Sequence, residues 1–273
     1  MGARIEGVDL VRLDDRGFDV IEQALHAHLV VILPGQNASP ESFVAFARRF
    51  GRPEPHVIDQ FHHRADPNIL ILSNRRNERG EPIGLADGGT YFHSDYSYLA
   101  VPARCTLLYA IEIPHAEAGT TFANQRQAYA ELTPATKATI DGLICRHHYG
   151  NRDVADEDAR IAASKLTGAQ KGKMTWVRHP LVRRHPHTGL KSLYAVSGSS
   201  YGIEGMDDRP AIALLDELKA HATRPEICHR PVYRPGDVVI WDNCSLLHSA
   251  PLIDPNEPRT LWRVTVKERG PTL

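Results

Sequence analysis

The chain has 273 residues, long for one average domain and short for two independent ones, so we expect a single domain over 1–273. A composition of 42% hydrophobic and 24% charged residues with a formal net charge of -1 argues against disorder and against a nucleic-acid partner. The four cysteines lack CxxC spacing, which disfavours a structural zinc site and favours a reducing cytoplasm. We expect no secretory signal and no membrane span, because no apolar run is long enough.

The first fifty residues predict two helices around a buried strand. Residues 18–28 carry apolar side chains at helical spacing, and the apolar run 30–35 ends in Pro-Gly, as a buried strand would. Ser39 and Pro40 are typical of a helix start, and Gly51 ends the same pattern. We expect these helices to be scaffold.

From residue 68 onward the sequence contains runs of β-branched and aromatic residues bounded by Pro, Gly and Asn, which predict strands. These runs are 68–74, 105–114, 190–198, 237–243 and 260–268, with helical patterns at 125–142 and 209–222. Strands and helices do not alternate regularly, and no GxGxxG or P-loop occurs, so a β-sandwich or jelly roll decorated by helices is favoured. Residues 151–175 are polar and weakly patterned, which predicts a long loop or lid.

The run YFHSDYSY contains a possible metal-binding pair. In an extended segment His93 and Asp95 point to the same face, with Cα atoms about 6 to 7 Å apart. Two histidines and one carboxylate are the ligand set of non-haem Fe(II) oxygenases, although Mn(II) and Zn(II) also suit these ligands. An H-x-D tripeptide alone is common, so a second histidine is required.

The far end of the chain supplies that histidine and two arginines. His248 follows the strong strand pattern at 237–243, and Arg259 and Arg263 lie eleven and fifteen residues beyond it. On a strand these two arginines share a face, with Cα atoms roughly 13 Å apart. Arginine is suited to bidentate binding of carboxylates and other oxyanions.

With these motifs in place, the sequence resembles the taurine dioxygenase/TfdA family of Fe(II)- and 2-oxoglutarate-dependent dioxygenases. The resemblance spans nearly the whole chain, from GARIEGVDL and ILPGQNASPESFVAFARRFG through FHSD and GTTF to HPLVRRHPHTGLKSLY, WDNCSLLHSAP and RTLWRVTV. It implies a mainly β fold with flanking helices (α+β), a double-stranded β-helix or jelly roll with a cupin-like core.

The resemblance also implies the cofactors and the residues that hold them. Fe(II) is expected at His93, Asp95 and His248, with 2-oxoglutarate and O2 as co-substrates. Thr121 and Arg259 match the residues that hold 2-oxoglutarate, and the reaction oxidises a substrate C–H bond, typically to an alcohol, with release of succinate and CO2. Hydrogen abstraction needs no general base, so none is assigned to the other histidines of the middle region, His115, His147, His148 and His179.

The substrate is expected to be a small anionic organic molecule. The resemblance gives Arg263 the role of binding its anionic group, and the further candidates for substrate contacts are His56, Tyr96, Ser199 and Tyr201. Gly89 and the small polar run at 198–202 differ from the taurine enzymes, which favours a larger ligand. The candidates are an aryloxyalkanoate, a sulfonate, or a carboxylate or amino-acid derivative. We expect a homo-oligomer, a dimer or a tetramer.

Three alternatives remain open from the sequence. One is an isonitrile-forming or other N-alkyl amino acid oxidase of the same superfamily. A second is a cupin-like metal hydrolase that uses Zn(II) on the same triad, which the arginines disfavour. A third is a non-catalytic ligand sensor, which the intact triad disfavours.

Overall fold

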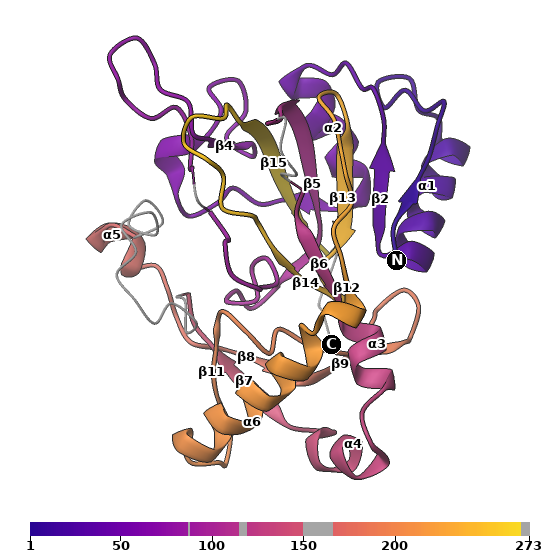
Figure 1. Ribbon diagram of the computed structural model, residues 1–273, viewed down its shortest axis with the longest axis vertical. Helices are drawn as coiled ribbons and strands as arrows, with labels where there is room; N and C mark the ends of the chain where they lie inside the picture. The colour runs from indigo at the N-terminus through magenta and orange to yellow at the C-terminus, as the bar shows by residue number, and fades with distance from the viewer. Residues whose placement is uncertain (87, 115–118, 150–165, 269–273) are drawn as a thin grey trace.

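The computed structural model describes residues 1–86, 88–114, 119–149 and 166–268 (Figure 1). A seven-stranded sheet forms its centre, antiparallel except where the two N-terminal strands pair. Its strands run in the order β1 (Ala3–Arg4), β2 (Val30–Leu33), β13 (Val238–Asp242), β5 (Ala103–Glu112), β15 (Thr260–Lys267) and β3 (Arg52–Pro53), with β4 (Leu70–Ser73) also paired to β15.

A smaller antiparallel sheet faces the large one. It consists of β12 (Cys228–His229), β6 (Thr121–Asn124) and β14 (Leu246–Ser249). Phe122 and Leu246 of this sheet pack with Val239, Trp241 and Leu261 of the large sheet, so the two sheets enclose one apolar core. Two facing sheets with this core form the jelly roll predicted from the sequence.

The two N-terminal helices cover the outer face of the large sheet (Figure 1). They are α1 (Asp15–His28) and α2 (Pro40–Phe50). Asp14 caps α1, which therefore begins three residues before the predicted 18–28, and Ser39 caps α2 as expected. Their apolar faces pack on β5, β13 and β15, which confirms their role as scaffold.

The predicted helix 125–142 is wrong in one respect, because the structure divides it. Thr133 caps a new helix and Pro134 has no N–H to continue the old one. The helices and short turns of this part of the chain are α3 (Gln125–Ala130), α4 (Pro134–Ile140), α5 (Gly168–Lys171), α6 (Asp208–Ala222) and the 3-10 turns η1 (Asp59–Phe61) and η3 (Pro225–Ile227).

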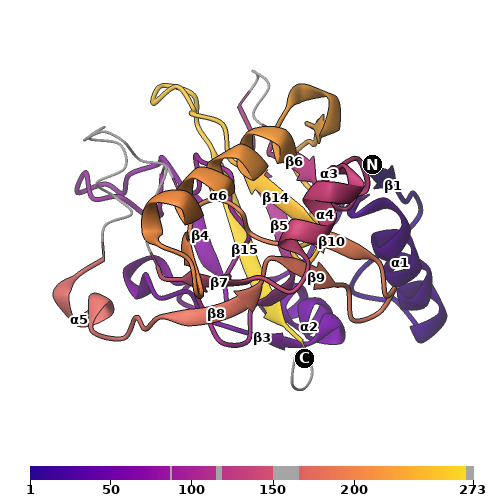
Figure 2. The ribbon, with the colours of Figure 1, turned by 90° about the horizontal axis from the view of Figure 1, so that it is seen from below.

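In the lower part of Figure 1, α6 lies against a third sheet, and Figure 2 shows the same helix from below. That sheet and a separate hairpin contain β11 (Ser200–Ile203), β7 (Ile144–His147), β8 (Val177–Pro180), β9 (Val182–Arg184) and β10 (Lys191–Leu193). Only the first part of the predicted strand 190–198 is extended. The loop expected at 151–175 lies outside the described residues up to 165, and its remainder contains α5.

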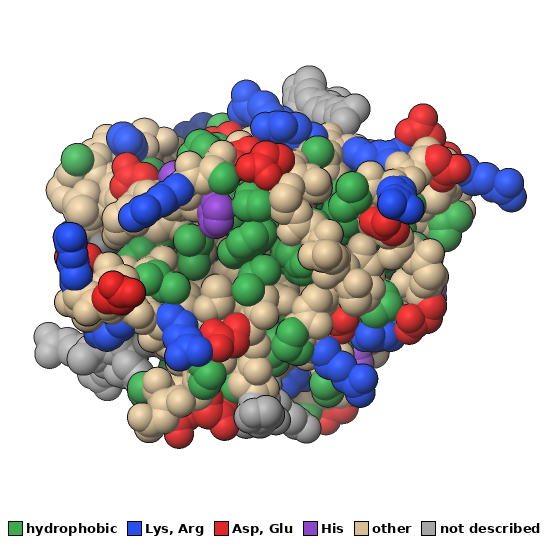
Figure 3. Space-filling view, turned by 90° about the horizontal axis from the view of Figure 1, so that it is seen from above, with side chains coloured by type: hydrophobic (Ala, Val, Ile, Leu, Met, Phe, Trp, Pro, Cys, Tyr) green, Lys and Arg blue, Asp and Glu red, His purple; other side chains and the backbone are tan. Residues whose placement is uncertain are grey.

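Acidic and basic side chains are interspersed on the face shown in Figure 3, rather than separated by sign. Hydrophobic side chains gather near the middle of the same face. Among the described residues, no helix has the length and apolar character that crossing a bilayer requires.

Candidate metal centre and adjoining cavity

His93, Asp95 and His248 converge on one point between the sheets. The Nε2 atoms of His93 and His248 lie 3.7 and 3.6 Å from the two carboxylate oxygens of Asp95. One ligand atom from each residue lies within 4.8 Å of the others, a spacing that fits a single metal ion. Two imidazoles and one carboxylate form the donor set of a non-haem Fe(II) centre.

Backbone pairing brings the two histidines together across 155 residues of sequence. His93 and His248 form an isolated antiparallel bridge, in which each backbone N–H donates to the carbonyl of the other residue, at 3.0 and 2.8 Å. Through this bridge the segment that contains His93 lies alongside β14, and the ring centroids of His93 and His248 are 4.2 Å apart. A strand of the small sheet therefore positions one ligand directly against the other.

The expected extended conformation holds at His93 but not beyond it. Asp95 begins a turn, and Tyr96 has a φ of 55°, which is rare for a residue with a side chain. The turn is stabilised by Asn243, whose Oδ1 accepts from the Asp95 backbone N–H at 3.2 Å. Asp95 reaches the histidines because the chain turns there, not because a strand alternates.

The two histidine rings are held by different interactions. His93 Nδ1 lies 2.8 Å from the Tyr91 carbonyl oxygen and must donate to it, which leaves the Nε2 lone pair facing Asp95. The ring of His248 packs against Trp241 at 4.8 Å, and its Nδ1 has no hydrogen-bond partner among the described residues. Burial and the neighbouring His93 lower the pKa of His248 to about 3, which keeps it the neutral imidazole that a metal requires.

The Asp95 carboxylate is oriented by two side chains from the large sheet. Thr106 Oγ1 donates to Oδ2 at 2.6 Å, and Arg263 Nη1 lies 3.3 Å from Oδ1. Asn243 Nδ2 in turn donates to Thr106 Oγ1 at 2.9 Å. Burial alone would raise the pKa of Asp95, but Arg263 and the two histidines hold it well below its usual range.

Sequence reasoning missed the roles of Thr106 and Asn243. Asn243 lies in the WDN run at 241–243, which is part of the family resemblance but does not by itself indicate that Asn243 contacts Asp95. Thr106 is one residue of a buried strand and carries no local signal, because it comes beside Asp95 only when Asn243, distant in sequence, bonds to both of them.

A cavity of about 390 Å³ opens directly beside the metal ligands. Its wall is largely aromatic and apolar, and Tyr98 and Tyr149 meet edge to face at 4.6 Å. Four residues predicted to contact substrate are in this wall, namely His56, Tyr96, Ser199 and Arg263.

His56 and Tyr96 lie next to each other in that wall, with ring centroids 5.9 Å apart. His56 Nδ1 accepts the backbone N–H of Ile58 at 3.1 Å, and burial together with the nearby Arg263 holds the pKa of His56 well below its usual value. His56 is therefore neutral and carries its proton on Nε2. The Tyr96 hydroxyl donates to the Glu54 carbonyl at 2.9 Å, so its ring rather than its hydroxyl is available to the cavity.

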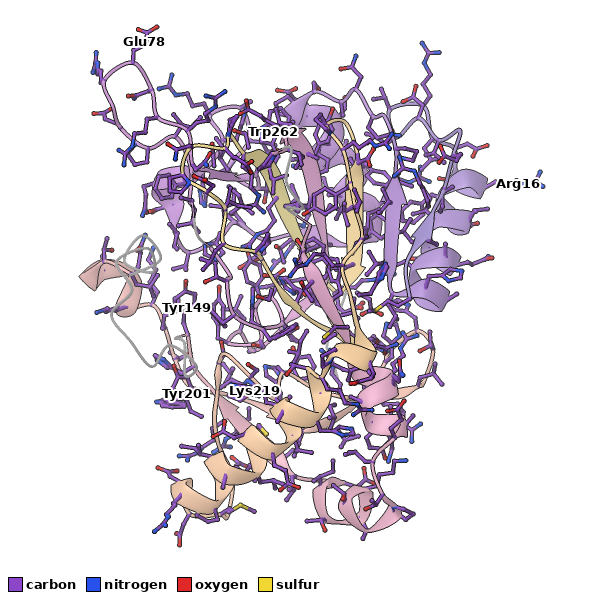
Figure 4. All side chains as sticks on the ribbon, viewed as in Figure 1. Arg16, Glu78, Tyr149, Tyr201, Lys219 and Trp262 are labelled. Carbon is purple, nitrogen blue, oxygen red and sulfur yellow. The ribbon has the colours of Figure 1, made fainter. Side chains whose placement is uncertain are left out.

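Two further candidates are not in the cavity wall. Tyr201 packs edge to face on Trp176 at 5.6 Å, and Figure 4 shows it below Tyr149, toward α6. Arg259 is buried beside Asn74, whose Oδ1 accepts the Arg259 backbone N–H at 2.9 Å. Arg259 immediately precedes β15 and Arg263 lies on it; of these two, Arg263 is the one in the cavity wall, beside Asp95.

Thr121 lies on the opposite face of its strand from the metal ligands. Phe122 pairs directly with His248, and such opposite residues share a face, so Thr121 points to the other side. Its hydroxyl accepts from Arg230 Nε at 2.8 Å. Thr120 is instead on the interior face, 3% exposed, with its hydroxyl 3.2 Å from that of Tyr233.

A second buried cluster, His185, Asp242 and Cys244, also has metal-like spacing. His185 Nδ1 accepts two backbone N–H groups and its Nε2 lies 2.9 Å from Asp242 Oδ2, so both ring nitrogens are used. Arg126 pairs with the same carboxylate at 3.2 Å. His185 and Asp242 are thus engaged by other protein groups, and burial raises the pKa of the Cys244 thiol to about 12, which keeps it from being the thiolate that a metal requires.

Comparisons with known proteins agree with this geometry. Residues 1–265 match the family described as taurine catabolism dioxygenase TauD, TfdA family. The chain is 31% identical to a pentalenolactone F synthase of Streptomyces arenae over 271 residues, covering 96% of this chain and 89% of that protein. It is 30% identical to an (S)-phenoxypropionate/alpha-ketoglutarate-dioxygenase of Delftia acidovorans over 276 residues, covering 100% and 94%.

A solved structure, AAD-2 in complex with Mn(II) and N-oxalylglycine, superposes with a TM-score of 0.79 at 28% identity and covers 100% of this chain and 95% of that one. The whole-chain family match, the jelly roll and the convergent triad point to one assignment. The chain belongs to the TauD/TfdA family and is an Fe(II)- and 2-oxoglutarate-dependent dioxygenase that acts on a small organic substrate.

Proposed function

We propose that His93, Asp95 and His248 hold the Fe(II) of this dioxygenase at the base of the cavity. The observation that carries the proposal is their convergence within 4.8 Å, with one oriented carboxylate and two imidazoles whose Nε2 atoms face it. When bound there, Fe(II) supplies the chemistry that couples oxidation of a substrate C–H bond to conversion of 2-oxoglutarate and O2 into succinate and CO2.

For 2-oxoglutarate we propose Arg259 and Thr120. Arg259 precedes Leu261 and Arg263 at alternate positions, and both of these residues face the interior. A buried guanidinium on that face suits the distal carboxylate of 2-oxoglutarate. Thr120 replaces Thr121 in this role, since its hydroxyl is on the interior face and that of Thr121 is not.

The cavity suits an anionic substrate with an apolar body. Among the described wall residues, Arg263 and Lys171 are the cations and Asp95, a proposed metal ligand, is the carboxylate. The rest of the wall includes Ile58, Leu85, Met174 and several tyrosines. We propose that Arg263 and neutral His56 bind the anionic group of an aryloxyalkanoate or a similar apolar carboxylate. The phenoxypropionate relative supports this choice.

Amino acids and taurine fit less well, because their ammonium group needs a carboxylate. Asp95 is the one carboxylate in the described wall, and Thr106 and Arg263 already engage it. Gly89 also shapes this end of the cavity. A Cβ there would lie 2.6 Å from His93 Cε1, so no larger side chain fits without displacing the ring.

We further propose that the enzyme is a cytoplasmic homo-oligomer. None of its four cysteines, all within the described residues, is in a disulfide, which supports a reducing compartment. The hydrophobic side chains gathered on the face in Figure 3 are a candidate contact between subunits. Light scattering coupled to size exclusion would measure the assembly, and a monomer at micromolar concentration would contradict this part of the proposal.

The iron proposal is tested by anaerobic addition of Fe(II) and 2-oxoglutarate to the purified protein. We expect the weak visible absorption band of an iron-chelated keto acid, and its loss in Asp95→Ala and His248→Ala. Asp19→Ala and His28→Ala, at exposed positions of α1, are the matched controls and should keep the band. A band that persists without Asp95 or His248 would place the iron elsewhere.

The substrate proposal is tested by substrate-stimulated succinate formation. The panel contains phenoxyacetate, 2-phenoxypropionate, their methyl esters and taurine. We expect stimulation by the acids and none by the neutral esters, because the esters lack the charge that Arg263 binds. Stimulation by taurine alone would overturn the apolar carboxylate as the substrate class.

A further inference from the structure

Residues 166–174, which include α5, have one side toward the cavity and one side toward η1. Leu166, Lys171 and Met174 are part of the cavity wall. Met174 also packs in the cluster that contains Tyr98 and Tyr149, so it continues the tyrosine surface outward from the metal centre. This segment thus contributes three residues to the part of the wall that lies outside the two sheets.

Gln170 fixes this segment to η1 on the side away from the cavity. Its side chain is buried, and its Nε2 donates to Asp59 Oδ1 at 3.1 Å and to Gln60 Oε1 at 3.2 Å. Its Oε1 accepts the Thr167 backbone N–H at 2.9 Å and completes the capping box of α5. A buried amide that lost these partners would be costly, so the contact fixes the position of α5.

The hydrogen bonds of Gln170 join two parts of the cavity wall. His56 and Ile58 line the cavity immediately before η1, and Lys171 and Met174 line it from α5. Gln170 connects the two segments at η1, across 110 residues of sequence. Gln170 thus helps to fix the distance between these two segments of the wall.

We propose that α5 is a substrate-selecting wall, with Gln170 as its positioning residue and with Lys171 and Met174 in contact with the remote end of the substrate. Lys171 lies in the cavity wall, is exposed and is in no ion pair with another described residue, so its ammonium is available to an electron-rich aromatic ring or a polar ring substituent. Met174 adds an adaptable apolar contact. The identity of the substrate rests on the proposed function, whereas the role of Gln170 rests on the bridge itself.

Gln170→Glu is the most informative variant, because it removes the hydrogen bonds to η1 and keeps the one that caps α5. A glutamate still accepts the Thr167 N–H and keeps the capping box, but it has no hydrogen to donate and brings a carboxylate against Asp59. Gln170→Ala removes both functions. Gln127→Ala is the control, because Gln127 on α3 likewise donates a side-chain hydrogen bond, but to Glu131 in an exposed position.

The measurements are steady-state kinetics with 2-phenoxypropionate and hydrogen exchange of the backbone amides, the latter with Mn(II) and N-oxalylglycine bound. For Gln170→Glu we expect the phenoxy acid KM to rise about tenfold, the loss typical of a hydrogen bond to a charged group. The 2-oxoglutarate KM and kcat should stay within about twofold, because the metal centre is held by other residues. Amides of 166–174 should exchange faster, and Lys171→Met should raise the phenoxy acid KM without changing exchange.

An unchanged phenoxy acid KM, or unchanged exchange at 166–174, in both Gln170 variants would overturn the proposal. An equal rise in the 2-oxoglutarate KM and the phenoxy acid KM would also overturn it, since that result indicates general damage to the fold. If the wild type oxidises no phenoxy acid but retains its iron and 2-oxoglutarate absorption band, the substrate class fails. In that case the test of Gln170 is the affinity of 2-phenoxypropionate for the protein with Mn(II) and N-oxalylglycine bound. Equal affinity in wild type and Gln170→Glu would overturn the proposed role of Gln170.

Discussion

The base and the rim of the cavity are built in different ways. At the base, the Asp95 backbone N–H donates to Asn243 in the β13–β14 turn, and the Asp95 carboxylate accepts from Thr106 of the large sheet. At the rim, Tyr149, Lys171 and Met174 come from connecting segments and are positioned by packing and by one amide bridge. The sheets can therefore preserve the iron chemistry while the connecting segments vary the substrate.

Replacement of the two arginines gives the largest expected effects and separates co-substrate from substrate. Arg263→Ala should impair the phenoxy acid and spare 2-oxoglutarate, whereas Arg259→Ala should weaken 2-oxoglutarate. Each loss removes one partner of a buried charged pair, on the order of 2 to 5 kcal/mol. Dissociation constants measured by calorimetry with Mn(II) in place of iron check both variants. The opposite pattern would mean that the two arginines have exchanged roles.

Acid should weaken the part of the fold that carries the rim. Burial and the neighbouring His179 lower the pKa of His147 to about 3. Burial lowers the pKa of His179 to about 4. Both values lie below the unfolded value of about 6.5. As the pH falls from 6.5 toward 4, the unfolded chain takes up protons that the folded chain does not. The free energy of unfolding should therefore fall by about 1.4 kcal/mol per pH unit for each histidine.

Urea unfolding between pH 7.5 and 4.5 measures this slope. His147→Gln removes one of the two groups and should make the dependence of stability on pH shallower below pH 6.5. His28→Gln, at an exposed position of α1, should leave the slope unchanged. Equal slopes in His147→Gln and wild type would show that His147 does not resist protonation in the folded protein.

At the base, Thr106→Val should weaken iron binding without disturbing the fold. Valine has the shape of threonine but lacks the hydroxyl that donates to Asp95 and accepts from Asn243. Loss of such a partner of a metal ligand typically costs 10- to 100-fold in metal affinity, so we expect an effect of about that size. Anaerobic Fe(II) titration measures it, with Thr139→Val at the surface of α4 as the control. Unchanged affinity would show that Arg263 and Asn243 suffice to orient Asp95.

The sequence predicted the base of the cavity better than its rim, for a physical reason. His93, Asp95 and His248 lie in short motifs whose residue types are demanded by metal chemistry. The rim is assembled from segments near residues 56, 149 and 171, and no local periodicity relates them. Tyr201, an aromatic residue of the run 198–202, is expected in the cavity from the sequence, yet it lies on strand β11 and packs against Trp176 instead.

The Thr-Thr pair shows how a single residue of register decides a site. The resemblance gives the role of holding 2-oxoglutarate to Thr121 of AGTTF, whereas Thr120 is the residue on the interior face, and on a strand a shift of one residue reverses the face. Thr120→Val should raise the 2-oxoglutarate KM roughly fivefold, the effect of one lost hydrogen bond, and Thr121→Val should leave it unchanged. Kinetics with 2-oxoglutarate varied at saturating substrate provide the measurement. An increase confined to Thr121→Val would mean that Phe122 and His248 do not share the face on which the co-substrate binds, and it would contradict the pairing of β6 with β14.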